Sequence, residues 1–206
     1  MLGHGAGGGV GARDLSHLAE ALPQRGFTVI LAEQPWRVAG RRVATAAPQL
    51  DAAWRCATQV LGSSELGGLP LVVGGRSTGA RVACRTVADT VAVGVLGLAF
   101  PLRPPWRPER SRVHELPLDR PVLIVQGDAD LFGQPSAFTG LPRLVTVASV
   151  PFADHEFSIR KGSPITQREG LELLNDHTQH WLDQLLIRES AAAHGCCRQC
   201  DGDHLG

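Results

Sequence analysis

Three side chains of the types used in acyl transfer follow separate apolar segments of this chain. Ser77 lies in the run Gly75-Arg76-Ser77-Thr78-Gly79, which follows Val72, Val73 and Gly74. A Gly-x-Ser-x-Gly run between a strand and a helix is typical of a nucleophile elbow, a tight turn that exposes the serine hydroxyl. The turn forces unusual backbone angles on the serine, and side chains at the flanking glycines would meet neighbouring elements. Ser77 is therefore the candidate nucleophile, with a simple helix N-cap as the alternative.

The candidate acid and base lie in later turns. A serine nucleophile needs a base to remove its proton and an acid to orient that base. In sheets that carry a nucleophile elbow, the acid and then the histidine follow the serine along the chain. Asp130 follows the apolar segment 121–126, and Asp128 in the same turn is the alternative acid. His155 follows the next apolar segment, 144–150, and is the candidate base among eight histidines.

The glycine-rich start of the chain could stabilise the negative charge that acyl transfer develops on a carbonyl oxygen. Backbone N–H groups fixed in advance are the usual donors to such an oxyanion. The elbow offers the N–H of Thr78, and the run His4-Gly5-Ala6-Gly7 offers that of Gly5 or Ala6. Glycines allow the close backbone approach that this requires. We expect His4 itself to be structural.

The same loop also fits a nucleotide-binding pattern. The spacing Gly3-x-Gly5-x-x-Gly8 matches G-x-G-x-x-G, and Glu33 stands about where a ribose-binding acid would lie. That pattern requires a strand before its first glycine, and only two residues precede Gly3. A dinucleotide site would also leave the serine, acid and histidine unexplained. We therefore treat dinucleotide binding as the weaker hypothesis.

The end of the chain contains residue types that bind zinc, namely Cys197 and Cys200 with His194 and His204. A single Cys-x-x-Cys in a segment without hydrophobic periodicity is a weak indication of a metal site. The sequence therefore predicts neither a metal nor a cofactor.

The composition is that of an ordinary globular protein. The chain has 206 residues, enough for one domain, and is 43% hydrophobic and 19% charged. Twenty basic and twenty acidic residues cancel, so neither nucleic acid nor an anionic membrane surface is indicated as a partner. No apolar run approaches the ~18 residues of a membrane helix, and the N-terminus lacks signal-peptide features. The five cysteines do not form the framework of a secreted protein, so a cytoplasmic location is expected.

The alternation of apolar segments with helical patterns predicts an α/β fold with a mostly parallel sheet of about six strands. After the start of the chain, the expected strands are 27–32, 71–74, 91–100, 121–126 and 144–150. Helical spacing of apolar residues predicts helices over 15–22, 50–61, 82–87 and 171–185, the last begun by Ser163-Pro164. Residues 1–188 form one predicted domain, and residues 189–206, which lack periodicity, are expected to be a disordered tail.

One connection, residues 101–118, is rich in proline and arginine. Long connections in compact domains are often functional. At this length it cannot form a large cap, so we expect an open site that takes short or flexible substrates. Its arginines are Arg103, Arg107, Arg110 and Arg112, and we interpret them as solvated rather than as an anion site.

The motifs occur in an order that carries a family resemblance. They are His4-Gly5-Ala6-Gly7, Gly74-Gly75-Arg76-Ser77, Phe100-Pro101-Leu102-Arg103-Pro104-Pro105, Arg107-Pro108-Glu109-Arg110, Val125-Gln126-Gly127 with Asp130 and Phe132-Gly133, and Asp154-His155 with Phe157. Over roughly residues 2–188 the chain resembles the small α/β-hydrolases of the dienelactone-hydrolase-like group. A relative of that group is the hydrolase-like domain of a subunit of a eukaryotic chromatin-modifying complex.

The resemblance implies a three-layer α/β-hydrolase sandwich with little or no cap, in which Ser77, Asp130 and His155 are nucleophile, acid and base. The Gln-Gly-x-x-Asp-x-Phe-Gly spacing favours Asp130 over Asp128. True dienelactone hydrolases use a cysteine nucleophile, so their substrate does not transfer to this chain. Thr78 also stands where a larger residue such as methionine is expected.

The sequence therefore predicts a serine hydrolase that cleaves a small ester, thioester or related acyl bond of a small molecule, without a cofactor. The alternative from another class is a non-enzymatic interaction module on the same scaffold, because a fold does not determine a function.

Overall fold

The computed structural model describes the backbone of residues 1–200 and the side chains of residues 1–191. Within that part of the chain, six strands form one sheet in the order β2-β1-β3-β4-β5-β6, and every pairing is parallel. The strands are β1 (Leu2–Gly3), β2 (Leu31–Ala32), β3 (Val72–Arg76), β4 (Gly94–Leu98), β5 (Val122–Gly127) and β6 (Val145–Val150). The predicted number of strands and their parallel arrangement are confirmed.

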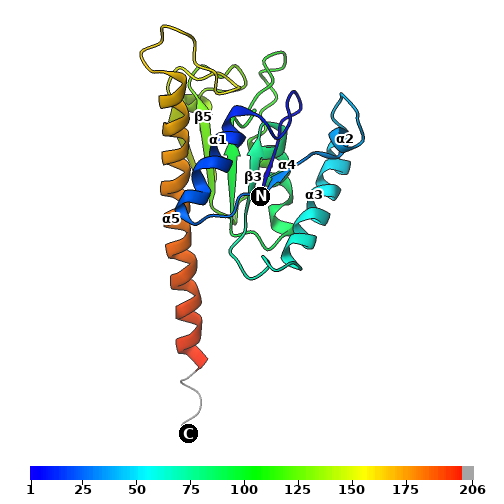
Figure 1. Ribbon diagram of the computed structural model, residues 1–206, viewed down its shortest axis with the longest axis vertical. Helices are drawn as coiled ribbons and strands as arrows, with labels where there is room; N and C mark the ends of the chain where they lie inside the picture. The colour runs from blue at the N-terminus through cyan, green and yellow to red at the C-terminus, as the bar shows by residue number, and fades with distance from the viewer. Residues whose placement is uncertain (201–206) are drawn as a thin grey trace.

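Helices cover both faces of this sheet and make a three-layer sandwich (Figure 1). One face carries α1 (Arg13–Ala21), which continues into the short 3-10 helix η1 (Leu22–Arg25), and α5 (Gln167–Cys200). The other face carries α3 (Ala47–Gly62) and α4 (Thr78–Thr86), with the short α2 (Pro35–Val38) beyond α3. The lower part of α5 extends past the end of the sheet (Figure 1).

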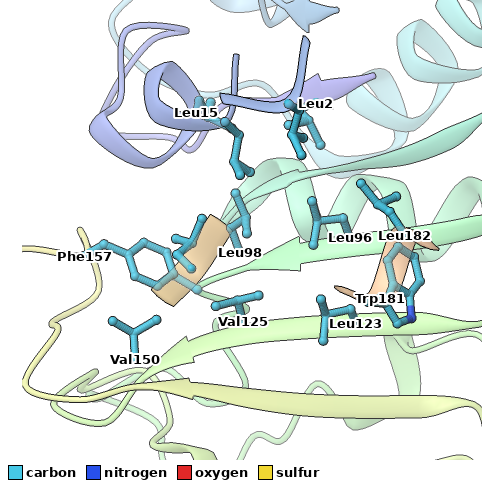
Figure 2. Packing of buried hydrophobic residues seen from close by; sticks show 14 of the residues in the cluster. Leu2, Leu15, Leu96, Leu98, Leu123, Val125, Val150, Phe157, Trp181 and Leu182 are labelled. Atoms are coloured by element: carbon cyan, nitrogen blue, oxygen red, sulfur yellow. The ribbon is translucent and has the colours of Figure 1, made fainter. Parts of the chain in front are cut away.

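Alternate residues of the central strands point into two separate hydrophobic cores. In β5, Leu123 and Val125 pack under α1 and α5, whereas Val122 and Ile124 pack under α3 and α4. Figure 2 shows the first core, where Leu15 of α1 and Trp181 and Leu182 of α5 lie over Leu96 and Leu98 of β4. A strand buried on both faces can be apolar throughout, which explains why β4 and β5 are continuous apolar runs in the sequence.

Two predicted strands are shorter in the structure than expected. The segment 27–32 forms a ladder only at Leu31–Ala32, because its neighbour β1 offers just two residues for pairing. The segment 91–100 is a strand only over Gly94–Leu98: Val91 is 71% exposed, and Ala99 turns out of the extended region with φ 45°. In both cases the length of the apolar run overestimates the length that neighbouring strands can pair.

The start of α5 also differs from the prediction. The helix begins at Gln167, not at Ser163-Pro164. The carboxylate of Glu169 accepts hydrogen bonds from the N–H (2.6 Å) and hydroxyl (2.7 Å) of Thr166, and the Thr166 hydroxyl accepts one from the Glu169 N–H (3.2 Å). This reciprocal arrangement is a capping box, which makes Thr166 the N-cap.

The connection 101–118 contains one short 3-10 helix, η3 (Val113–Glu115), and no cap. Glu115 accepts hydrogen bonds from Arg81 and Arg85 of α4, which fix the connection to that helix. Arg112 donates to the carbonyl of Pro101 at 2.6 Å. This arginine therefore supports the connection itself. Arg103, Arg107 and Arg110 are exposed, as expected.

The predicted boundary at residue 188 remains a prediction. Helix α5 continues to Cys200, but the side chains from residue 192 onward and all of residues 201–206 lie outside the described part of the chain. The zinc-binding residue types of the tail, His194, Cys197, Cys200 and His204, fall in that region. In the described part, no helix is long and apolar enough to cross a membrane.

Candidate active site

Ser77 occupies a strained turn between β3 and α4. Its backbone angles are φ 51° and ψ −106°, outside the regions that a serine normally adopts. The flanking glycines are required for close packing, because a Cβ on Gly75 or on Gly79 would overlap the carbonyl oxygen of Gly3 in β1. The turn thus has the geometry expected of a nucleophile elbow.

The structure brings Ser77, His155 and Asp130 together in one hydrogen-bonded chain. His155 Nε2 lies 3.0 Å from Ser77 Oγ, and His155 Nδ1 lies 2.8 Å from Asp130 Oδ2. The three residues follow β3, β6 and β5, whose carboxyl ends meet at one edge of the sheet. A serine, an imidazole and a carboxylate connected in this order have the geometry needed to deprotonate the serine hydroxyl.

The two aspartates of the β5 turn have different surroundings. Asp130 is buried, and its Oδ2 accepts a hydrogen bond from Gln126 Nε2 (2.7 Å) while its Oδ1 accepts one from the Phe132 N–H (2.8 Å). These two donors orient the carboxylate toward His155. Asp128 is exposed, and its Oδ1 accepts a hydrogen bond from the Phe152 N–H at 2.6 Å. Asp128 therefore connects the β5 turn to the turn after β6, and only Asp130 contacts the histidine.

Aromatic rings lie along the outer side of His155. The Phe132 ring stacks on the imidazole with centroids 4.2 Å apart, and Trp106 meets Phe132 edge-on at 5.8 Å. Trp106 comes from the connection 101–118 and is 71% exposed. Phe132 on the imidazole, with the exposed indole against Phe132, gives this side of the site an apolar, aromatic edge.

The glycine-rich loop lies directly beside the elbow. A Cβ on Gly5 would be 3.3 Å from the Cβ of Ser77. The buried His4 has its Nδ1 2.8 Å from the Gly5 carbonyl oxygen, which can only accept, so Nδ1 carries the proton. This bond fixes the peptide group that contains the Gly5 carbonyl and the Ala6 N–H. Since the two point in opposite directions in a trans peptide, the Ala6 N–H faces away from His4.

Glu33, which stands where a ribose-binding acid would lie, contacts His4 in the structure. Nε2 of His4 lies 3.0 Å from the Gln34 N–H and 2.8 Å from Glu33 Oε1. Glu33 therefore contacts the glycine-rich loop through His4. His4 is structural, as expected, and orients the backbone of the loop.

Non-glycine residues with positive φ cluster around this edge of the sheet. They are Ser77, Ala99, Phe152 and Phe157, which lie after β3, β4 and β6. Such conformations cost of order 1–3 kcal/mol each and persist where the surrounding structure holds them in place. Their concentration here makes this edge the candidate functional one.

A separate cavity of about 410 Å³ lies at the opposite end of the sheet. Its lining includes segments 26–30 and 69–72 and the α5 residues Leu182 and Leu185, and none of Ser77, Asp130 and His155. Among the described residues, no cluster of three or more His, Cys, Asp or Glu side chains could hold a metal ion.

Sequence reasoning did not assign a role to Gln126 or Arg76. The resemblance included Gln126 in a motif, and the structure explains its position: the buried amide donates to Asp130 and to the Gly133 carbonyl (2.8 Å). Arg76 directly precedes Ser77, and its Nη2 donates to the backbone carbonyl of His155 at 2.8 Å. A charged residue at the end of a buried strand was the available signal for Arg76.

Comparison with known proteins supports a relationship over most of the chain. The family model described as "Alpha/beta hydrolase domain" matches residues 1–183. Comparison with curated proteins found no match.

Solved structures of similar fold include a serine hydrolase without a lid from Xanthomonas campestris, 21% identical, covering 85% of this chain and 76% of that one with a TM-score of 0.61. A serine hydrolase homologue from Coxiella burnetii is 18% identical, with coverage of 82% and 78% and a TM-score of 0.65. Est1E from Butyrivibrio proteoclasticus, solved with bound ferulic acid, is 13% identical, with coverage of 88% of each chain and a TM-score of 0.66. At these identities the likeness concerns the fold.

Proposed function

Because this chain belongs to the α/β hydrolase domain family, we propose that it is a serine hydrolase that cleaves a small ester, thioester or related acyl bond. The observation that carries the proposal is the continuous chain from Ser77 Oγ through the imidazole of His155 to Asp130, with contacts of 3.0 and 2.8 Å. This chain of hydrogen bonds ends on a serine in a strained, positive-φ turn.

The proposed reaction begins when Ser77 Oγ attacks the substrate carbonyl carbon. His155 Nε2 takes the hydroxyl proton, and Asp130 holds the proton on Nδ1 and stabilises the imidazolium that forms. The tetrahedral intermediate collapses, and His155 donates its proton to the departing alcohol or thiol, leaving an acyl-Ser77 ester. A water molecule then attacks this ester with His155 as base, which releases the acid and restores Ser77.

The oxyanion of the intermediate requires fixed N–H donors. We assign these to Thr78, the first residue of α4, and to the glycine-rich loop. Within the loop, the His4 contact that fixes the Gly5–Ala6 peptide favours the Ala6 N–H over that of Gly5. The positive end of α4 also favours negative charge near Thr78.

Two features bear on the substrate. The connection 101–118 forms no helical cap, which favours short or flexible substrates that bind from open solvent. The aromatic edge made by Trp106 and Phe132 favours an apolar or aromatic group beside His155. Since ferulic acid is bound to the structurally similar Est1E, aromatic acyl esters should be screened with acetyl and butyryl esters and thioesters.

Covalent labelling by a fluorophosphonate probe tests the proposal. We expect the folded wild type to be labelled, and Ser77→Ala and heat-denatured protein to remain unlabelled. Ser136→Ala, an exposed serine between β5 and β6, is the matched control and should label like the wild type. If folded wild-type protein is not labelled, the hydrolase proposal fails and an interaction module becomes the better interpretation.

A further inference from the structure

Arg76 is a nearly buried cation that contacts several parts of the site. The residue is 6% exposed, and its Nη2 donates to the His155 carbonyl at 2.8 Å. A Cβ on Gly5 would lie 3.3 Å from Nη1, so the glycine-rich loop packs against the same guanidinium. One side chain therefore contacts the backbone of the candidate base and the loop that carries an oxyanion donor.

The counter-ion of Arg76 is Asp14, in the first turn of α1. Asp14 is fully buried, and its Oδ2 lies 3.6 Å from Arg76 Nε. Among the described residues, neither carboxylate oxygen of Asp14 nor Arg76 Nε has a hydrogen-bond partner. Because a buried cation without a counter-ion is strongly unfavourable, we expect the Arg76 guanidinium to leave this position when Asp14 is neutral.

We infer that Asp14 and Arg76 form a positioning pair, in which Asp14 holds the guanidinium and the guanidinium holds the His155 turn and the glycine-rich loop against the elbow. This inference rests on the proposed function. Neither residue is a catalytic residue, because Arg76 contacts the His155 backbone rather than its ring, and Asp14 acts only through Arg76.

The ionisation of Asp14 makes the positioning pair sensitive to pH. Burial raises the pKa of Asp14 to about 6, against the opposing effects of Arg76, the nearby backbone N–H groups of Asp14 and Leu15, and Arg13. From helix α5, which packs against α1, the neutral Gln167 accepts a hydrogen bond from Arg13. Above pH 6 the ionised Asp14 neutralises Arg76. Below pH 6 Arg76 loses its counter-ion, and the His155 turn loses its anchor.

Three variants separate this role from general structural support. Asp14→Asn removes the counter-ion, and Arg76→Lys keeps the positive charge but shortens the arm that reaches the His155 carbonyl. Asp89→Asn, from the exposed Arg55–Asp89 ion pair, is the matched control. Because a catalytic group displaced by about 1 Å can cost about 100-fold, we expect each of the first two variants to lower the fluorophosphonate labelling rate at pH 8 by about 10-fold or more.

The pH profile and the double variant test whether the two residues act together. For the wild type and for Asp89→Asn, the acid limb of the labelling rate should include the ionisation of Asp14. In Asp14→Asn this ionisation should be absent. The double variant, which combines Asp14→Asn with Arg76→Lys, should lose no more activity than either single variant. Both changes remove the same contact to the His155 turn. An unchanged acid limb in Asp14→Asn, or additive losses in the double variant, would overturn the inference.

Hydrogen exchange provides a readout that does not depend on activity. Asp14→Asn should increase amide exchange in residues 151–158 and in the glycine-rich loop, and leave exchange in α3 unchanged. Should that variant not fold, the wild type carries the same test, because exchange in residues 151–158, corrected for its intrinsic pH dependence, must increase below pH 6. Unlabelled wild type with these exchange changes would refute the proposed function alone, whereas labelled wild type without them would refute the positioning pair alone.

Discussion

The two aspartates of the β5 turn have different tasks although only one residue separates them. Asp130 is buried and contacts His155, whereas Asp128 is exposed and contacts the Phe152 backbone. Sequence spacing alone leaves both as candidate acids, because both follow the same strand. The direction in which each side chain leaves the turn makes the distinction. The sequence favours Asp130, and the family spacing strengthens that prediction.

Substitution of the two aspartates should separate catalysis from stability. Asp130→Asn should reduce the labelling rate by about 10⁴-fold, since an amide at this position favours the wrong imidazole tautomer. Asp128→Asn should weaken one backbone hydrogen bond, lower the free energy of unfolding by about 1 kcal/mol and leave labelling close to wild type. Stopped-flow or gel-based labelling and urea denaturation measure these effects. Equal loss of labelling in both variants would contradict the assignment of Asp130.

At the scale of elements, the capping box at the start of α5 stabilises a helix that also contacts the His155 turn. Gln167, the first residue of α5, donates to the Phe157 carbonyl (2.7 Å) and accepts from the Ile159 N–H (3.0 Å). The sequence pattern Thr166-x-x-Glu169 is that of a capping box and therefore indicates where α5 begins. The Ser163-Pro164 pair upstream also predicts a helix start, because proline is common at the first helical position.

Loss of the N-cap should destabilise the protein in a pH-dependent way. Thr166→Ala should lower the free energy of unfolding at pH 7 by about 1 kcal/mol. Hydrogen bonds from the backbone N–H and the hydroxyl of Thr166 hold the pKa of the Glu169 carboxyl below its usual 4.5, so their contribution is present above that pH and is lost as the pH falls through the folded pKa. The substitution removes the hydroxyl bond and keeps the backbone one. The cost of the substitution should therefore shrink in acid. Urea denaturation at pH 7 and pH 3 measures it, with Thr139→Ala as the exposed control; an equal cost at both pH values would contradict this account.

Strand number, parallel pairing and layer arrangement could be predicted because they depend on patterns within single segments. Apolar runs such as that of β5 and the helical spacing of Val82, Ala83 and Val87 are local, and all three residues are buried as predicted. Strand lengths were less predictable, since pairing depends on the neighbouring strand. The Asp14–Arg76 pair was missed, because it joins residues of opposite charge from distant segments. The available signal was a carboxylate one position before Leu15, on the apolar face of α1.

For the whole molecule, the buried Asp14 links folding to pH. Its pKa is raised from 3.8 to about 6, so its favourable contribution to folding is complete below pH 4 and is lost as the pH rises through 6. Asp14→Asn, which resembles the neutral carboxyl, should match the wild type in stability below pH 4 and exceed it at pH 8, by up to about 3 kcal/mol.

Urea denaturation of both proteins at pH 4 and pH 8 measures this difference, with Asp89→Asn as the exposed control. A stability difference that does not change between these two pH values would show that Asp14 does not carry the ionisation. Higher stability combined with slower labelling in Asp14→Asn would mean that the protein keeps a buried charge for the sake of its active site.

The six-residue ladder between β5 and β6, from Val122 opposite Val145 to Gly127 opposite Val150, has a consequence for how the chain can vary in length. One residue of a parallel strand advances about 3.3 Å, which is longer than the hydrogen bond between His155 and Asp130. Insertions in segment 139–144, which enters β6 from the far end, leave the paired residues unchanged. A single residue added inside β6 would carry the histidine out of reach of the aspartate in a protein that still folds. Natural length variation should therefore collect at the end of the sheet remote from Ser77.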